Sequence, residues 1–413
     1  MEILHTCCAG LDVHKEIVVA CVRRLVEGKV RQEVRTFRTE TNQLLALADW
    51  LTDEGVTHVA MESTGVYWKP IWNLFEGVFE LMLCNAEHIK AVPGRKTDVK
   101  DSQWIAQLLQ HGLLKPSFVP EKPIRQLRDL TRSRVQLVRQ KVQVVNRIQK
   151  TLEDANIKLA SVASNVMGAS GRDMLRAIIR GERDPVVLAE LARQRLRAKI
   201  PQLQEALFGE IEEHHRFLLG MLWDEVEFLE KQIERLTARV AEVLPPPFVE
   251  AVTRLQTIPG IDRRAAEGIV AEVGADLKAF ASAGHLSSWV GICPGNHESA
   301  GKRKSGRTTK GNAWLRALLV QCAWGASRSK GTYLQSMFRR LAARRGTKRA
   351  LVAVGHRLLE IIYAVLKKGQ SYRELGADYL DRAQNRERLK ARLVKRLEKL
   401  GVKVTVDEAQ PAT

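Results

Sequence analysis

Lys96-Thr-Asp-Val-Lys-Asp-Ser-Gln-Trp-Ile-Ala-Gln-Leu-Leu109 is a polar segment that leads into an apolar one, and it predicts a helix that begins near Asp98. Asp98 and Asp101 lie three positions apart, and residues at this spacing share one helix face, about 5 to 6 Å from each other. Two like charges held this close need a cation or a proton to offset their repulsion. We therefore expect a divalent metal ion at this end of the helix.

The elements around this helix define the class of the domain. Three strands, a helix, a strand, a helix, a strand and a helix follow one another, and this order predicts an α/β layer structure. It is the order of the RNase H-like fold shared by many nucleases and integrases. The strands are expected over residues 7–12, 16–22, 30–38, 58–61 and 79–84, and the helices over residues 42–52, 67–75 and from Asp98 onward.

Two more acidic residues lie at the ends of predicted strands. Asp12 ends the first strand, and Glu62 directly follows the fourth. In an RNase H-like layer these strands are neighbours and the last helix packs across them, so four carboxylates would surround one cavity. Oxygen ligands without Cys or His suit Mg²⁺ or Mn²⁺, and such an ion supports phosphodiester cleavage. For any single acid the alternative is a helix cap or a surface charge.

The charge of the chain limits its partners. The 413 residues carry a formal net charge of +19 with 45% hydrophobic residues, which predicts two or three domains and a polyanionic partner such as nucleic acid. No apolar run reaches the roughly 20 residues that span a bilayer, and no signal peptide is evident, so we expect a cytoplasmic protein without membrane contact. The six cysteines show no CxxC pair and no zinc spacing, and the four near the N-terminus lie in apolar, strand-like segments, which indicates buried, reduced thiols.

Two long helical runs follow the first domain. Residues 127–152 carry a seam at three- and four-residue spacing, with the basic Arg134 and Lys141 at two of its positions. Residues 222–243 keep the same spacing throughout and stop at three consecutive prolines. This pattern predicts a coiled coil or a helical hairpin. Between the runs, residues 161–181 contain glycine and serine and indicate a turn region between helices.

A helix-hairpin-helix element is expected over residues 255–274, around Ile258-Pro-Gly-Ile261. Such a turn presents backbone N–H groups at a helix N-terminus, where a phosphate can bind. An ordinary turn between two helices fits the same residues equally well.

A basic loop further along the chain is a second candidate site. Residues 299–349 contain fourteen Lys or Arg and no acidic residue, which predicts contact with phosphates. Ser299 lies there among small residues, so its hydroxyl is a candidate nucleophile whose neighbouring cations would stabilise phosphorane charge. A phosphate-binding or turn residue is the alternative, and Ser305 is an equal candidate. The cations assigned to nucleic-acid binding are Lys302, Arg303, Lys304, Arg307 and Lys310.

The chain resembles the DEDD transposases of the IS110 insertion-sequence family, relatives of the Piv DNA invertases. The matching segments extend to about residue 340 and are specific when taken together. They are Gly10-Leu-Asp-Val-His-Lys15, Met61-Glu-Ser-Thr-Gly65, Lys96-Thr-Asp-Val-Lys-Asp101, Ile258-Pro-Gly-Ile261, and Trp289-Val-Gly through Glu298-Ser-Ala-Gly-Lys302.

The resemblance implies a RuvC-like domain, a coiled-coil segment and a C-terminal transposase domain that act together. It implies that Asp12, Glu62, Asp98 and Asp101 bind Mg²⁺, and that Ser299 forms a covalent phosphoserine link to a DNA strand. It also implies an element-encoded bridge RNA that pairs with donor and target DNA. The active sites would form in a dimer of dimers, with the RuvC-like domain of one subunit and the serine domain of another.

We therefore expect a RuvC-like DEDD domain over 1–118, a helical coiled-coil segment for dimerisation and RNA binding over 119–247, a serine-containing transposase domain over 248–345 and a basic helical extension over 346–413. The leading hypothesis is an RNA-guided, site-specific DNA recombinase. The alternatives are a metal-only RuvC-like junction resolvase, a Piv-type invertase without guide RNA, and a noncatalytic scaffold that binds nucleic acid. The guide RNA, the target core and the choice among excision, insertion and inversion stay open.

Overall fold

The computed structural model describes residues 2–63, 65–92, 101–293, 297–299, 302–305, 308–382 and 386–401. The chain forms two compact units, Met1–Pro120 and Glu121–Thr413, which are described in turn.

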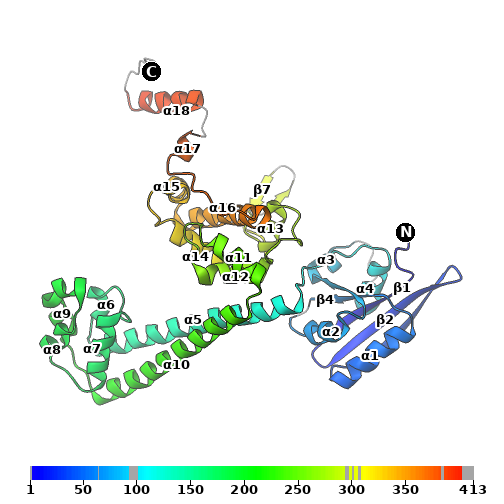
Figure 1. The fold of residues 1–413 in the computed structure, drawn as a ribbon, viewed down its shortest axis with the longest axis horizontal. Helices are drawn as coiled ribbons and strands as arrows, with labels where there is room; N and C mark the ends of the chain where they lie inside the picture. Colours follow the sequence, from blue (N-terminus) through cyan, green and yellow to red (C-terminus); the bar gives the residue numbers. More distant parts are fainter. Residues whose placement is uncertain are drawn as a thin grey trace. The chain divides into compact units, whose positions relative to one another are not determined.

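The first unit contains a five-stranded mixed sheet in the order β3-β2-β1-β4-β5 (Figure 1). The first three strands are antiparallel neighbours, whereas β4 and β5 run parallel to β1. The RNase H-like α/β domain predicted from the element order is thereby confirmed. The strands are β1 (Cys7–Val13), β2 (Ile17–Val26), β3 (Lys29–Arg38), β4 (His58–Glu62) and β5 (Glu80–Cys84).

Apolar residues cover both faces of this sheet. On one face, alternate β1 residues such as Leu11 pack against α1 (Thr41–Asp53) and α2 (Trp68–Phe75). On the other face, Cys8 of β1 and Ala60 of β4 pack against α4, described from Asp101 to Gln110. Successive side chains of a strand point to opposite faces, so the even-numbered residues of β1 and β4 face α4. A short helix that the sequence did not predict, α3 (Ala86–Ala91), adds Ile89 to that second core.

The second unit begins with two long helices, α5 (Lys122–Asp154) and α10 (Glu213–Val243), which lie side by side (Figure 1). They run antiparallel, because Lys141 pairs with Glu230 at 3.2 Å and Arg147 with Glu225 at 2.7 Å. The predicted seam lies between them, since Val144, Ile148, Val226 and Leu229 are buried there. The basic seam position Lys141 is thus satisfied by an acid of the partner helix.

A compact group of short helices connects α5 to α10, with a core that includes Met174, Leu188 and Leu203. The prediction of a turn region over residues 161–181 is therefore wrong. Gly171 lies inside a helix, where an added Cβ would approach the carbonyl oxygen of Val166 to 2.1 Å, so this glycine serves close packing. The elements are α6 (Leu159–Val162), α7 (Ala169–Ile179), α8 (Pro185–Glu190), η1 (Gln194–Lys199) and α9 (Ile200–Leu207).

The rest of the unit is mainly helical, as predicted for the C-terminal transposase domain. Its core forms around α16 (Thr347–Lys368), which packs on α11, α13, α14 and α15. Within the described part of the chain, no helix combines the length and the apolar character needed to cross a membrane. The other elements are α11 (Pro246–Leu255), α12 (Arg263–Val273), α13 (Ala283–Val290), β6 (His297–Ser299), β7 (Lys302–Ser305), α14 (Ala313–Ala326), α15 (Tyr333–Arg345), α17 (Tyr379–Arg382) and α18 (Arg386–Glu398).

The predicted helix-hairpin-helix element corresponds to α11, a short turn and α12. Ile258 and Ile261 of the turn are buried. The Asp262 carboxylate accepts a hydrogen bond of 2.8 Å from the N–H of Ala265, so the chain's own acid caps the N-terminus of α12. A negative side chain at this position opposes phosphate binding, and the geometry favours the ordinary turn of the two interpretations.

Candidate active site

Asp12 and Glu62 lie at the carboxyl ends of two adjacent parallel strands. Leu11 of β1 pairs with Met61 of β4, so the next residue on each strand places the two acids side by side. Both acids also face the same side of the sheet. Alternation puts Asp12 on the face of Cys8 and Glu62 on the face of Ala60, and this is the face that α4 covers.

The described part of α4 begins at this same edge of the sheet. Cys8 donates a 3.6 Å hydrogen bond to the carbonyl of Ala106, whereas Gly10, nearer the carboxyl end of β1, lies against Ser102. The helix therefore runs antiparallel to β1, and its first turn lies above the end of the strand. Asp101, which precedes Ser102, is an exposed residue of that turn. The structure thus brings Asp12, Glu62 and Asp101 to one edge of the domain.

Gly10 allows this close approach of strand and helix. A Cβ added at Gly10 would lie 2.3 Å from the backbone nitrogen of Ala106 and 2.5 Å from the carbonyl oxygen of Ser102. Both are backbone atoms, so a side chain at this position would push the whole helix away from the sheet. The position of Asp101 at this edge therefore depends on a residue that carries no charge itself.

We expect Gly10→Ala to loosen α4 and to reduce catalysis, because the displaced helix carries Asp101 away from the two strands. Overpacking of this kind typically costs about 1–3 kcal/mol, and amide hydrogen exchange should become faster in α4 and β1. The matched control is Gly220→Ala in α10, where the added methyl meets only Ile179 at 3.8 Å and alanine favours the helix. Equal exchange rates in wild type and Gly10→Ala would contradict this packing argument.

The donor set at this edge fits a hard divalent cation. The three described acids offer only carboxylate oxygens, the ligands that Mg²⁺ and Mn²⁺ prefer. The Asp12 side chain is 20% exposed and contacts the Nε2 atom of His14 at 3.1 Å, so it stays reachable from solvent. Asp98, the fourth acid of the prediction, lies outside the described residues.

The predicted nucleophile lies on a hairpin of the second unit. Ser299 ends β6 and pairs with Lys302, the first residue of the antiparallel β7. The side chains of the hairpin residues, among them Lys302, Arg303, Lys304 and Ser305, lie outside the described part of the structure, as does Arg307. Lys310, which follows the hairpin, is exposed.

Both ends of this loop are fixed at one place. The N–H of Asn312 donates a 3.2 Å hydrogen bond to the carbonyl of Trp289, so the segments before and after the loop lie side by side. Gly291 and Gly311 permit this contact, because a Cβ added at Gly311 would lie 2.5 Å from the carbonyl oxygen of Val290. The two ends of the loop that carries Ser299 are therefore held together at its base.

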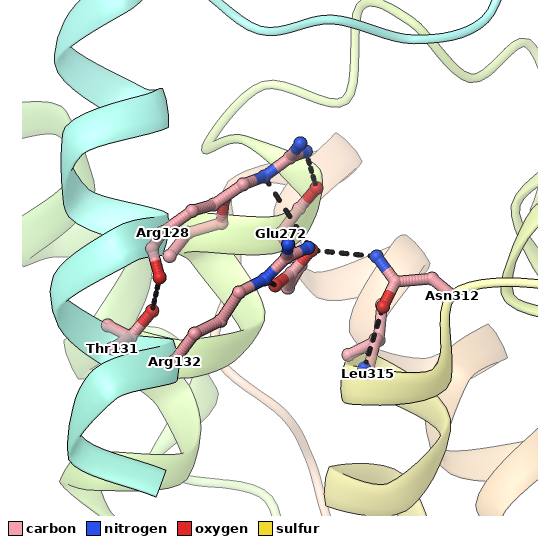
Figure 2. Close-up of polar contacts among 7 residues, drawn as sticks. Arg128, Thr131, Arg132, Glu272, Asn312 and Leu315 are labelled. Carbon is pink, nitrogen blue, oxygen red and sulfur yellow. Dashed lines mark hydrogen bonds and ion pairs between the residues drawn. The ribbon is translucent and has the colours of Figure 1, made fainter. Parts of the chain in front are cut away.

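Asn312 also connects that base to a buried ionic cluster, which Figure 2 shows. Its side-chain carbonyl caps α14 and its amide donates a 2.7 Å hydrogen bond to Glu272 of α12. Glu272 is 3% exposed and binds Arg132 of α5 through two hydrogen bonds of 2.7 and 2.8 Å (Figure 2). Arg128 donates to the carbonyl groups of Ala271 and Glu272 at the end of α12. Helices α5 and α12 and the serine loop thus share one polar junction.

A second buried pair lies beside this junction. Arg134, the other basic seam position of α5, binds Glu267 at 2.8 Å, and both side chains are at most 5% exposed. Sequence reasoning recognised Arg134 as an exception in the seam but did not find its partner. The available signal was two acids, Glu267 and Glu272, in the otherwise apolar part of α12 from residue 265 to residue 273.

Asp154, His214 and His215 form a different cluster, with ligand atoms within 4.8 Å of one another. His215 Nδ1 accepts a hydrogen bond from the N–H of Glu212, so the ring proton lies on Nε2, 3.2 Å from Asp154. Neither nitrogen of His215 then has a free lone pair for a metal. This cluster caps α10 and is structural.

The cysteines have no chemical role at either candidate site. Burial raises the pKa of the Cys8, Cys84 and Cys322 thiols to about 12, so these groups stay protonated. All six cysteines are free, and four of them are buried, whereas Cys7 and Cys293 are partly exposed.

An RNase H-like sheet with carboxylates at one edge, joined to a mostly helical unit, is the organisation of a DEDD transposase. The family model of IS110 DEDD transposases matches residues 9–157, and the model of the transposase IS116/IS110/IS902 family matches residues 252–338. The chain belongs to the IS110 family of transposases. It is therefore an enzyme that cleaves DNA and transfers DNA strands, and its family implies a divalent metal and a DNA substrate.

Individual relatives agree with this assignment. The chain is 26% identical over 376 residues to a probable family 20 transposase of Pseudomonas aeruginosa, covering 88% of this chain and 94% of the relative. It is also 26% identical to the transposase for insertion sequence element IS1111A of Coxiella burnetii, covering 88% and 90% of the two chains. A pilin gene-inverting protein of Moraxella bovis is more distant, with 28% identity over 31% of this chain and 40% of its own.

Proposed function

We propose that this transposase cleaves DNA at a composite site in which Asp12, Glu62, Asp98 and Asp101 bind Mg²⁺ or Mn²⁺ and Ser299 attacks the phosphodiester. The observation that carries the metal part of the proposal is the arrangement of Asp12, Glu62 and Asp101 at one edge of the sheet. When bound, a divalent cation would offset the negative charge on the phosphate and on the leaving oxygen.

The proposed reaction exchanges one phosphodiester bond for another and needs no oxidant or reductant. The Ser299 hydroxyl oxygen forms a bond to phosphorus while one P–O bond of the DNA backbone breaks. The serine proton passes to a base or water, and the departing strand oxygen takes up a proton. The energy of the broken phosphodiester is retained in the phosphoserine link, so a second strand end can later displace the serine. The basic residues Lys302, Arg303, Lys304, Arg307 and Lys310 would hold the phosphates of the strand.

The wider assembly is part of the same proposal. An element-encoded bridge RNA pairs with donor and target DNA, and the helical segment of α5 and α10 serves dimerisation and RNA binding. A dimer of dimers then combines the RuvC-like domain of one subunit with the serine domain of another. The domain limits at residues 118, 247 and 345 belong to this proposal, and the resemblance to the IS110 family supports it.

Trapping of the covalent intermediate tests the nucleophile. We expect wild-type protein to form a denaturant-resistant protein–DNA adduct, Ser299→Ala to form none, and the matched variant Ser305→Ala to keep it. The adducted peptide, identified by mass spectrometry, should contain Ser299. Cleavage by Ser299→Ala at the wild-type rate would leave a metal-only resolvase as the better description.

Inversion without a guide RNA is the second candidate, because the chain matches a pilin gene-inverting protein over about a third of its length. Sequencing of RNA that copurifies with the protein, compared with the flanking genome, distinguishes the two. A bridge RNA predicts one enriched transcript, and ribonuclease treatment should abolish recombination. Full activity after ribonuclease treatment would favour the unguided invertase.

A further inference from the structure

The second unit has an arginine-lined pocket that neither the carboxylate cluster nor the serine loop uses. It lies between α5, α12 and α14, is open to solvent and has a cavity volume of about 50 Å³. Its walls include Arg132, Arg139, Arg264, Trp314 and Gln321. The open shape suits part of an extended polymer better than a small molecule that the protein would enclose.

Two of the pocket's arginines already have fixed partners. Arg132 forms the two hydrogen bonds to Glu272, and Arg134 is paired with Glu267. Arg139 and Arg264 are exposed and have no carboxylate partner within the described part of the chain. The pocket therefore carries two positive charges that the described acids do not neutralise, and this excess favours an anionic ligand.

Trp314 gives the pocket an aromatic wall. The guanidinium carbons of Arg132 and Arg139, which lie about two turns apart on α5, are 5.5 and 5.2 Å from the centre of its ring. Arg132 is held in place by Glu272, whereas Arg139 has no such anchor. Arg139 can therefore leave the ring for a phosphate, and a nucleobase can take its place on the indole. Base stacking on an aromatic side chain is sequence-tolerant and contributes about 1–3 kcal/mol per base.

We propose that this pocket binds one unpaired nucleotide of a nucleic-acid strand, with its base stacked on Trp314 and the adjacent phosphates bound by Arg139 and Arg264. Bases in a duplex are stacked on each other and cannot reach the ring, so the site selects single strands. An unpaired position of an RNA and a displaced DNA strand offer the same chemistry. The proposal does not depend on the identity of the nucleophile.

The test measures binding of the full-length protein to labelled single-stranded DNA and RNA of one sequence over a range of salt concentrations. Each phosphate contact to a single strand contributes about 0.7 to the slope of log affinity against log salt. We expect the double variant Arg139→Ala/Arg264→Ala to reduce that slope by about 1.4. The control Arg254→Ala removes an arginine of α11 that is paired with Glu250, and it should leave the slope unchanged.

Replacement of Trp314 should change the affinity for single strands but not its dependence on salt. Trp314→Leu is expected to weaken single-strand binding about tenfold, within the range of one lost base stack, without a change in the salt slope. Trp314→Phe should retain most of the affinity. If Trp314→Leu unfolds, the arginine double variant still decides the question. A larger loss for RNA assigns the pocket to an RNA strand, and a larger loss for DNA assigns it to the DNA substrate.

Three results would overturn the proposal. The first is an unchanged slope in the arginine double variant, and the second is an equal change in Arg254→Ala. The third is an equal loss of affinity for duplex and single-stranded probes in the folded Trp314→Leu protein.

Discussion

Asp12→Asn and Glu62→Gln should each reduce DNA strand cleavage by roughly a thousandfold or more while the fold stays intact. Both changes keep the size of the side chain and remove the charge that a divalent cation needs. Metal ions supply several kcal/mol of charge stabilisation in phosphoryl transfer, and about 4 kcal/mol corresponds to a thousandfold change in rate. The measurement is single-turnover cleavage of donor DNA at saturating Mg²⁺.

The control for these variants is Glu80→Gln. Glu80 is an exposed acid at the opposite end of β5, the strand next to β4, so it lies in the same sheet away from the proposed metal site. Its variant should cleave at the wild-type rate. An active Asp12→Asn protein, or a Glu80→Gln protein that is equally impaired, would remove the basis for a site at this edge.

Glu272→Gln should strongly destabilise the second unit. The Glu272 carboxylate neutralises Arg132 and lies 3.6 Å from Arg128, whose side chain is only 12% exposed. Burial lowers the pKa of Arg128 to about 10, which still leaves it charged near neutral pH. Removal of one partner from a buried ion pair typically costs about 3–5 kcal/mol. For a unit of this size we expect a fall in Tm of roughly 6 °C or more.

Glu225→Gln provides the comparison. Glu225 also pairs with an arginine of α5, but both side chains are about half exposed, at 45% and 53%. Exposed pairs contribute about 0–1 kcal/mol, so Tm should hardly change. Hydrogen exchange should accelerate in α12 and at the start of α14 for Glu272→Gln only, because glutamine has one acceptor oxygen in place of the two that serve Arg132 and Asn312. Similar small shifts in both variants would show that the junction is not a stabilising element.

The N-terminal domain could be predicted from sequence because its signals are local. Short apolar runs identified β1 and β4, and the acids at the strand ends followed from that assignment. The register that places Asp12 beside Glu62 required only the order of the strands. The role of Gly10 was not visible in the same way, because it depends on how closely α4 approaches the sheet. That distance is set by packing between segments almost 100 residues apart.

The junction of the second unit could not be predicted, since its partners lie far apart in the chain. Arg134 and Glu267 are separated by 133 positions, and Arg132 and Glu272 by 140. A heptad pattern shows that a charge interrupts a seam, but it does not identify the residue that compensates it. Gly171 was misleading for a related reason, because a glycine required by helix packing resembles a glycine in a turn.

Direct metal binding tests the central claim most clearly. Titration of the DNA-free protein with Mn²⁺, followed by electron paramagnetic resonance, measures binding independently of catalysis. We predict that the wild type and Glu80→Gln bind Mn²⁺ and that the double variant Asp12→Asn/Glu62→Gln has lost this binding while its thermal unfolding is unchanged. Binding of equal affinity and stoichiometry in the double variant would contradict the assignment of these carboxylates as the metal site.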